Sequence, residues 1–150
     1  MSRDWTSFLR SSMPLADAMA VTAQTLPDGR IALAVPLGPN VNDKGTGFGG
    51  SVATLATLAG WVEVQRQLDQ FAPASGVEIV IQRGETHYLK PIRNDFEACA
   101  ILPDATELER FLRLYARKGL ARLALTVEVH CQGEHVAQFG GDYVASRNAA

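Results

Sequence analysis

Charge and cysteine are both scarce in this chain of 150 residues, and each shortage excludes a class of protein. Charged residues make up 20% of the chain, with 14 Lys and Arg set against 16 Asp and Glu. The resulting net charge of −2 gives no broad basic field, so nucleic acid is not an expected partner. The two cysteines, Cys99 and Cys131, are far apart in no ligand-like spacing. We expect two reduced thiols in strands, and no metal site.

Long apolar runs are also missing. The longest, residues 52–64, has thirteen residues and is too short to span a bilayer. The first nine residues carry Asp4 and lack the apolar core of a secretory signal. We therefore expect a cytoplasmic protein with no membrane partner. Apolar residues at 47% suffice for one domain over residues 1–150, which buries roughly 70% of its unfolded surface at this length.

The first half of the chain predicts a hairpin, a loop and one long helix. Residues 21–25 and 30–35 flank a Pro-Asp-Gly turn and are typical of two paired strands, after a short lead-in helix at 14–20. Residues 36–50 hold Pro, Asn, Asp and Gly and predict a loop. Residues 51–70 predict a helix whose first half is apolar on every side and must be buried. We expect its last turns, which carry the polar residues Gln65, Arg66, Gln67, Asp69 and Gln70, to emerge into solvent. Glu63 either is a buried carboxylate that could act as a base or also emerges into solvent, and we favour the second.

Beyond this helix the apolar period changes to two, the period of a strand. Strands are expected at residues 77–89, with a kink at Gly84, and at 96–101, 123–130 and 135–145. A short helix is expected at 107–118, with a capping box at Thr106 and Glu109 and a stop at Gly119.

The order of these elements predicts an α+β fold. Strands joined by short turns favour an antiparallel sheet, and a helix that is apolar all round needs that sheet wrapped around it. A curved antiparallel sheet around one long central helix is the hot-dog fold. The alternative is a generic α+β sandwich with the helix packed flat on one face.

The segment that leads into the long helix is rich in glycine. Four of the thirteen glycines, Gly45, Gly47, Gly49 and Gly50, fall within six residues. The first amides of a helix have no internal partner and can stabilise a carbonyl oxygen that gains charge. The alternative is that these glycines only make a tight loop. The segment is not a phosphate-binding P-loop, because Lys44 precedes the glycines instead of following them.

Several runs in the chain resemble the putative thioesterase family of the YiiD C-terminal type, which has the hot-dog fold. They are Pro36-Leu37, Pro39-Asn40, Asn42, Gly45-Thr46, Phe48-Gly49-Gly50-Ser51, Leu58-Ala59-Gly60-Trp61, Tyr88-Leu89-Lys90-Pro91-Ile92 and Gly140-Gly141-Asp142-Tyr143-Val144-Ala145. The resemblance implies an acyl-thioester hydrolase that needs no cofactor and acts on acyl-CoA or acyl-carrier protein.

A wider comparison assigns roles to individual residues. Hot-dog thioesterases of the phenylacetyl-CoA type carry Asn, then Gly, then His-Gly-Gly at the start of the central helix, and a carboxylate two turns further on. This resemblance implies that Gly49 N–H is the oxyanion donor, and it matches Asn42 to their Asn and Gly50 to their second Gly. Phe48 replaces their His and Thr57 replaces their carboxylate.

These two replacements leave the catalytic base open. Thr57 either positions a water or bonds back to the preceding turn. Asn42 either holds the water or the carbonyl, or caps its own loop. Asp43 and His87 are the best candidates for proton transfer. The expected substrate-binding residues are Phe48, Gly50, Ser51, Trp61, Tyr88, Lys90 and Arg93. The candidates for the phosphates of CoA are Lys90, Arg93, Arg117 and Lys118, and the alternative for each is a solvated surface residue.

The leading hypothesis is a thioesterase whose site lies between two subunits of a homodimer or a dimer of dimers, since a hot-dog sheet leaves an edge strand to cover. One alternative is an acyl-thioester binding module without hydrolysis, which the two replacements favour. The other is a hot-dog dehydratase, which Thr57 disfavours because that chemistry needs a carboxylate on the helix.

Overall fold

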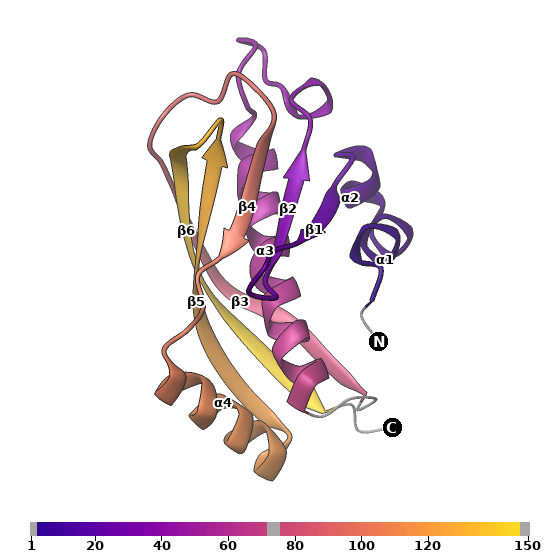
Figure 1. Ribbon diagram of the computed structural model, residues 1–150, viewed down its shortest axis with the longest axis vertical. Helices are drawn as coiled ribbons and strands as arrows, with labels where there is room; N and C mark the ends of the chain where they lie inside the picture. Colours follow the sequence, from indigo (N-terminus) through magenta and orange to yellow (C-terminus); the bar gives the residue numbers. More distant parts are fainter. Residues whose placement is uncertain (1–2, 72–75, 148–150) are drawn as a thin grey trace.

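One long helix lies against the inner face of a curved, six-stranded antiparallel sheet (Figure 1). The computed structural model describes residues 3–71 and 76–147. The elements are α1 (Trp5–Ser12), α2 (Pro14–Ala18), β1 (Thr22–Thr25), β2 (Ile31–Val35), a 3₁₀ turn (Gly38–Asn40), α3 (Gly49–Phe71), β3 (Val77–Tyr88), β4 (Phe96–Ala100), α4 (Ala105–Lys118), β5 (Leu120–Cys131) and β6 (Glu134–Arg147). This arrangement confirms the hot-dog fold.

The strands follow the order β1-β2-β4-β5-β6-β3, so β1 and β3 are the two edges. Strand β3 pairs with β6 along its whole length, from Val77 opposite Arg147 to Tyr88 opposite Ala137. The register shifts between Ile81 and Arg83, so the irregularity lies at a bulge and not at Gly84 as expected.

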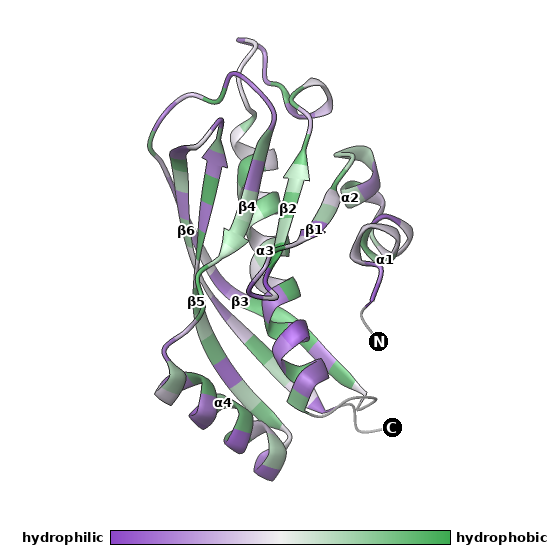
Figure 2. Ribbon diagram, in the orientation of Figure 1, coloured by the Kyte–Doolittle hydropathy of each residue, from purple (hydrophilic) through white to green (hydrophobic). Residues whose placement is uncertain are grey.

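Most of the apolar first half of α3 is buried, as its pattern requires, and a stripe with Ala53, Thr57 and Trp61 is half-buried. Figure 2 shows the hydrophobic residues along this helix. Close approach of the sheet explains Gly60, because a Cβ there would overlap the Tyr143 hydroxyl. That hydroxyl donates to the Thr57 carbonyl at 2.7 Å. Burial raises the pKa of Tyr143 well above its usual value, so the phenol stays a donor.

The polar end of α3 is buried too, contrary to the prediction. The Glu63 side chain is only 2% exposed, and its carboxylate accepts hydrogen bonds from Arg66 at 2.8 and 3.1 Å and from Gln67 at 2.7 Å. Gln65 donates to Asp69 at 2.8 Å. Each of these polar groups forms a hydrogen bond with a residue one helical turn away, which allows this segment to be buried.

An N-terminal helix that the sequence did not predict, α1, packs against the middle of α3. Trp5 and Phe8 contact the Trp61 ring at centroid distances of 6.2 and 6.0 Å. The Trp61 indole N–H donates to the Ile79 carbonyl of β3 at 3.0 Å. Trp61 is therefore held between α1 and the edge strand.

Helix α4 has a different N-cap from the predicted one and ends at the predicted glycine. Asp104 is the N-cap and accepts from Thr106 N–H at 3.1 Å, so the prediction of Thr106 with Glu109 was wrong. Gly119 ends the helix with φ of 69°, as expected. Arg147 donates to the Tyr115 and Ala116 carbonyls at 3.0 and 3.1 Å. None of the helices in the described residues is long and apolar enough to cross a membrane.

Candidate active site

The loop before α3 is closed by the side chain of Asn42. Its amide donates to the Thr46 hydroxyl at 2.9 Å, and its oxygen accepts from Lys44 N–H at 2.8 Å and Thr46 N–H at 3.0 Å. Gly45, with φ of 82°, makes the turn that these bonds require. Asn42 therefore shapes the glycine loop, and its amide group is engaged within it.

Two further bonds dock this loop on the body of the protein. Gly47 N–H donates to the Ile92 carbonyl and Phe48 N–H to the Asn40 carbonyl, both at 2.8 Å. The Asn40 side chain is 1% exposed and donates to the Met19 and Pro36 carbonyls at 3.0 and 2.8 Å. Asn40 is a positioning residue that the sequence reasoning missed, since only its burial separates it from an ordinary loop asparagine.

The start of α3 carries three unpaired donors. The first helical bond runs from Val52 N–H to the Phe48 carbonyl at 3.0 Å. Within the described part of the chain, the N–H groups of Gly49, Gly50 and Ser51 meet no acceptor. These groups point out of the positive end of a 23-residue helix, which favours a partial negative charge.

Two exposed aromatic rings border these donors. The Tyr88 hydroxyl donates to the Gly49 carbonyl at 2.8 Å, from the end of edge strand β3. A Cβ at Gly50 would lie 2.5 Å from the Phe48 ring, so the glycine is required by the ring beside it. Phe48 and Tyr88 are 53% and 56% exposed and leave apolar surface around the amides.

Thr57 lies on the same helix, two turns further on. Its hydroxyl donates to the Ala53 carbonyl at 2.8 Å, which leaves the oxygen free to accept a bond from water. Eight residues of helix separate it from Gly49, or about 12 Å along the axis. One carbonyl group therefore cannot contact both residues of a single chain.

The basic candidates lie beside the glycine loop. Lys90 and Arg93 border a hollow of about 270 Å³ and flank Ile92, which is bonded to the loop. The Lys90 ammonium donates to Glu134 at 2.7 Å and holds the pKa of that carboxyl below its usual value. Lys44 pairs with Asp43 at 3.1 Å at the exposed tip of the loop.

The structure does not bring His87 to the glycine loop. Side chains alternate along a strand, and neighbouring Tyr88 faces α3, so His87 faces the outer side of the sheet. There it bonds Glu85 at 2.5 Å. Trp61 is also distant from the donors, twelve residues along the helix from Gly49 or about 18 Å.

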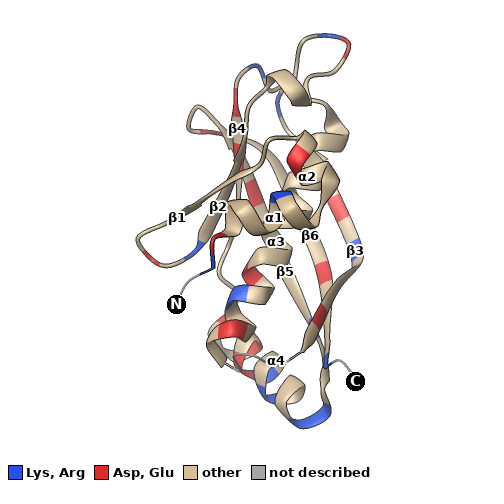
Figure 3. Ribbon diagram, turned by 90° about the vertical axis from the view of Figure 1, so that its right-hand side faces the viewer, with Lys and Arg blue, Asp and Glu red and all other residues tan. Residues whose placement is uncertain are grey.

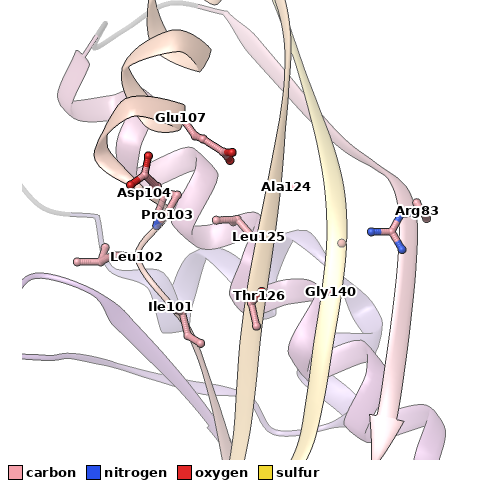
Figure 4. A pocket seen from close by; sticks show the side chains of 11 residues that line it. Arg83, Ile101, Leu102, Pro103, Asp104, Glu107, Ala124, Leu125, Thr126 and Gly140 are labelled. Carbon is pink, nitrogen blue, oxygen red and sulfur yellow. The ribbon is translucent and has the colours of Figure 1, made fainter.

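A separate hollow of about 380 Å³ opens on the outer face of the sheet (Figure 4). Arg83 lies on one side of it, and the carboxylates of Asp104 and Glu107 lie on the other. Gly140 forms part of its floor. The sheet stands between this hollow and the start of α3, so the hollow belongs to a different face from the donor amides.

Comparison with known proteins identifies a family and several similar structures. A family model described as a putative thioesterase (yiiD_Cterm) matches residues 2–147. A putative thioesterase from Shewanella oneidensis is 30% identical, with a TM-score of 0.79 over 95% of this chain and 94% of that one. A protein of unknown function from Chlorobaculum tepidum TLS is 27% identical, with a TM-score of 0.86 over 95% and 92%.

One similar structure contains a ligand. A protein from Bacillus halodurans, solved with CoA, is 26% identical to this chain. Its TM-score is 0.71, and the match covers 96% of this chain and 85% of that one.

Proposed function

The chain belongs to the putative thioesterase family of the YiiD C-terminal type, a family of thioester hydrolases, and we propose that it hydrolyses acyl thioesters of coenzyme A or of acyl-carrier protein. The observation that carries this proposal is the row of unpaired N–H groups at Gly49, Gly50 and Ser51. A thioester oxygen becomes an oxyanion when water attacks its carbonyl carbon, and such donors stabilise that charge.

Gly49 N–H is the donor that we place on the oxyanion. The hydrogen bonds of Asn42 hold the loop before it, and the Tyr88 hydroxyl holds the carbonyl of the same residue. Donors that are already fixed need no rearrangement when charge develops. The N–H groups of Gly50 and Ser51 follow in the first turn of the helix, and we propose that they bind the substrate.

The surroundings of these donors suit an acyl-CoA. Phe48 and Tyr88 supply apolar walls for the acyl chain or the pantetheine arm. Lys90 and Arg93, beside the docked loop, are placed to meet phosphates. The Bacillus halodurans neighbour, which was solved with CoA, supports CoA as one of the two carriers.

We place the complete site between two copies of the chain. In the described part of the chain, β3 pairs with β6 along one edge, and its other edge is open. The strand exposes Val80 and Ile81, at 58% and 39%. Antiparallel pairing of two such strands would cover this edge and bring a second α3 close to the first. Thr57, too far from Gly49 in its own chain, then orients the attacking water for the other copy.

Proton transfer is assigned to Asp43, the carboxylate of the glycine loop. It is exposed, and within residues 3–71 and 76–147 it pairs only with neighbouring Lys44, so it is free to move toward a bound substrate. His87 and Trp61 receive no role at this site, because one faces the outer side of the sheet and the other packs beneath α1.

Replacing Gly49 by proline tests the donor directly. Proline is favoured at the first helical position and carries a ring carbon in place of the N–H hydrogen, whereas alanine at the same position adds a Cβ and keeps the N–H group. A Cβ at Gly49 finds ordinary space, 3.4 Å from the Tyr88 oxygen. We expect Gly49→Pro to lower kcat for octanoyl-CoA by about 10² to 10³, and Gly49→Ala to stay within a few-fold. Equal rates for the two variants would overturn the site assignment.

The second candidate is a module that binds acyl thioesters without hydrolysing them. Phe48 and Thr57 stand where the wider superfamily carries His and a carboxylate, and this observation favours it. Tight binding of octanoyl-CoA with no release of free thiol would select this function. Release of CoA in step with octanoate would exclude it.

A further inference from the structure

Three arginines form a line along the solvent-facing side of α4. Phe111 and Tyr115 anchor the helix, at 2% and 1% exposure. Arg110, Arg113 and Arg117 follow at spacings of three and four residues, and all three are exposed. Arg113 and Arg117 lie opposite the anchors, and Arg110 lies at the side of the helix, where it borders a hollow against the sheet together with Glu107 and Asp142. The line is about 10 Å long, from seven residues of helical rise. We call it the arginine line.

The guanidinium groups of this line form no ion pair among residues 3–71 and 76–147. Helix α4 carries Arg110, Arg113, Arg117 and Lys118 against Glu107 and Glu109, so basic residues are in excess on it. Figure 3 shows both kinds of charge on α4, at one end of the molecule. The excess stands out because the whole chain carries a net charge of −2.

Helix stability explains part of the arrangement. Basic residues in the last turn interact favourably with the helix dipole, which accounts for Arg117 and Lys118. Arg110 and Arg113 follow Glu107 and Glu109 by three and four residues, a spacing at which opposite charges stabilise a helix by a few tenths of a kcal/mol per pair. The like charges along the arginine line cost the isolated helix a similar amount per pair, so helix stability gives no net reason for the line.

The place of α4 relates it to the active site of a second copy. In its own chain, α4 lies at the opposite end of the molecule from the glycine loop (Figure 1). It leads into β5, and Leu120 of β5, Ser146 of β6 and Glu78 of β3 are neighbours in one row across the sheet. If two β3 strands pair antiparallel about their middle, the next strand in this row is that of the second copy. The Tyr88 end of that strand is then three strand spacings from Leu120, or about 14 Å, and Gly49 of that copy lies one tyrosine side chain further, on the face of the sheet that carries α3.

We propose that the arginine line docks an acidic acyl-carrier protein, which delivers its acyl group to the active site of the second copy. This inference rests on the proposed thioesterase function and on the proposed pairing of β3. A carrier protein is a small acidic helical protein whose pantetheine arm extends from its surface, so it can be held at one place while its thioester reacts at another. A row of carboxylates on one helix matches arginines spaced by three and four residues. Coenzyme A is a small molecule without a protein surface, so it cannot contact the whole arginine line while its thioester lies in the active site.

Binding of holo-acyl-carrier protein to the full chain tests the proposal without relying on hydrolysis. The test variant is Arg110→Gln/Arg113→Gln/Arg117→Gln, which keeps good helix formers at exposed positions. Arg10→Gln, at a half-exposed position of α1 where the arginine pairs with Asp17, is the control for loss of a charge elsewhere. Since three exposed ion pairs together amount to about a factor of ten, we expect the triple variant to bind at least tenfold more weakly. The control should stay within about twofold.

Octanoyl-CoA and the octanoyl-carrier protein separate the docking from the chemistry. We expect the triple variant to lose kcat/KM only for the carrier substrate, mainly through KM, and this loss to shrink as salt is added. Equal binding of the carrier by wild type and triple variant would overturn the inference. So would a wild-type protein that ignores the carrier but binds anionic lipid vesicles through the same arginines. A wild type that binds the carrier but cleaves neither thioester would instead overturn the proposed hydrolysis.

Discussion

Replacing Arg66 with methionine is expected to destabilise the protein by about 3 kcal/mol, because it leaves a buried carboxylate without its cation. Glu63 is 2% exposed and the Arg66 side chain 13% exposed. Both guanidinium bonds to the carboxylate, at 2.8 and 3.1 Å, would be lost. The bond from Gln67 at 2.7 Å would remain, which places the cost at the low end of the usual range for breaking a buried pair.

The partner variant makes this reasoning specific to charge. In Glu63→Leu/Arg66→Met both charges are gone and the helix face is apolar, so the free energy of unfolding should recover to within about 1 kcal/mol of wild type. Urea denaturation followed by circular dichroism measures all three proteins. At this chain length, 3 kcal/mol corresponds to a fall in Tm of roughly 6 to 12 °C.

Two results would refute this explanation of the Glu63–Arg66 pair. If Arg66→Met costs less than about 1 kcal/mol, the carboxylate is not held by the guanidinium, or it is hydrated. If the double variant is less stable than Arg66→Met, the residues matter by shape and not by charge. Arg66→Lys, which keeps the charge but loses the paired bonds, is the control and should fall between wild type and Arg66→Met.

Three shorter predictions concern the packing of α3, its first turn and one thiol. Gly60→Ala should lower the free energy of unfolding by about 1 to 3 kcal/mol, since its Cβ would overlap the Tyr143 hydroxyl, and Gly60→Ala/Tyr143→Phe should recover part of this loss in thermal melts. Tyr88→Phe should lower kcat for octanoyl-CoA by about tenfold with little change in KM, because only the bond that fixes the Gly49 carbonyl is removed; a change in KM alone would contradict this. Burial raises the pKa of the Cys99 thiol, so at pH 8 it carries less thiolate and should react with iodoacetamide more slowly than in urea, and equal rates would contradict this.

Sequence patterns correctly predicted the elements that depend only on residues close together in the chain. The alternation in β4 and β5 and the all-round apolar face of α3 each depend on one choice of buried side, and the sheet and helix follow it. Gly119 ended α4 as expected because a left-handed residue is a local requirement. Such features need no knowledge of the partner element.

Features that depend on a distant partner were missed. Helix α1 has only Trp5, Phe8 and Leu9 as an apolar pattern, and its strongest contact, with Trp61, is more than fifty residues away. The polar end of α3 was expected in solvent, because nothing local shows that Glu63 and Arg66 neutralise each other under cover. Asn42 was weighed as a catalytic amide and as a loop cap, and only the structure shows all three of its bonds inside the loop.

The candidate site shows the same division between local and distant information. Glycines at the start of a predicted helix indicate free N–H donors, so Gly49 and Gly50 could be proposed as donors from their spacing and from the family resemblance. The group that activates water follows no such local rule, because it has to reach the donors from elsewhere. Thr57 lies about 12 Å along the axis from Gly49, while the neighbouring edge strand β3 is open to a second chain. In the proposed site, the fixed donors and the acceptor hydroxyl two turns away come from different copies, because an antiparallel pairing of β3 would bring the Thr57 of one copy toward the Gly49 of the other.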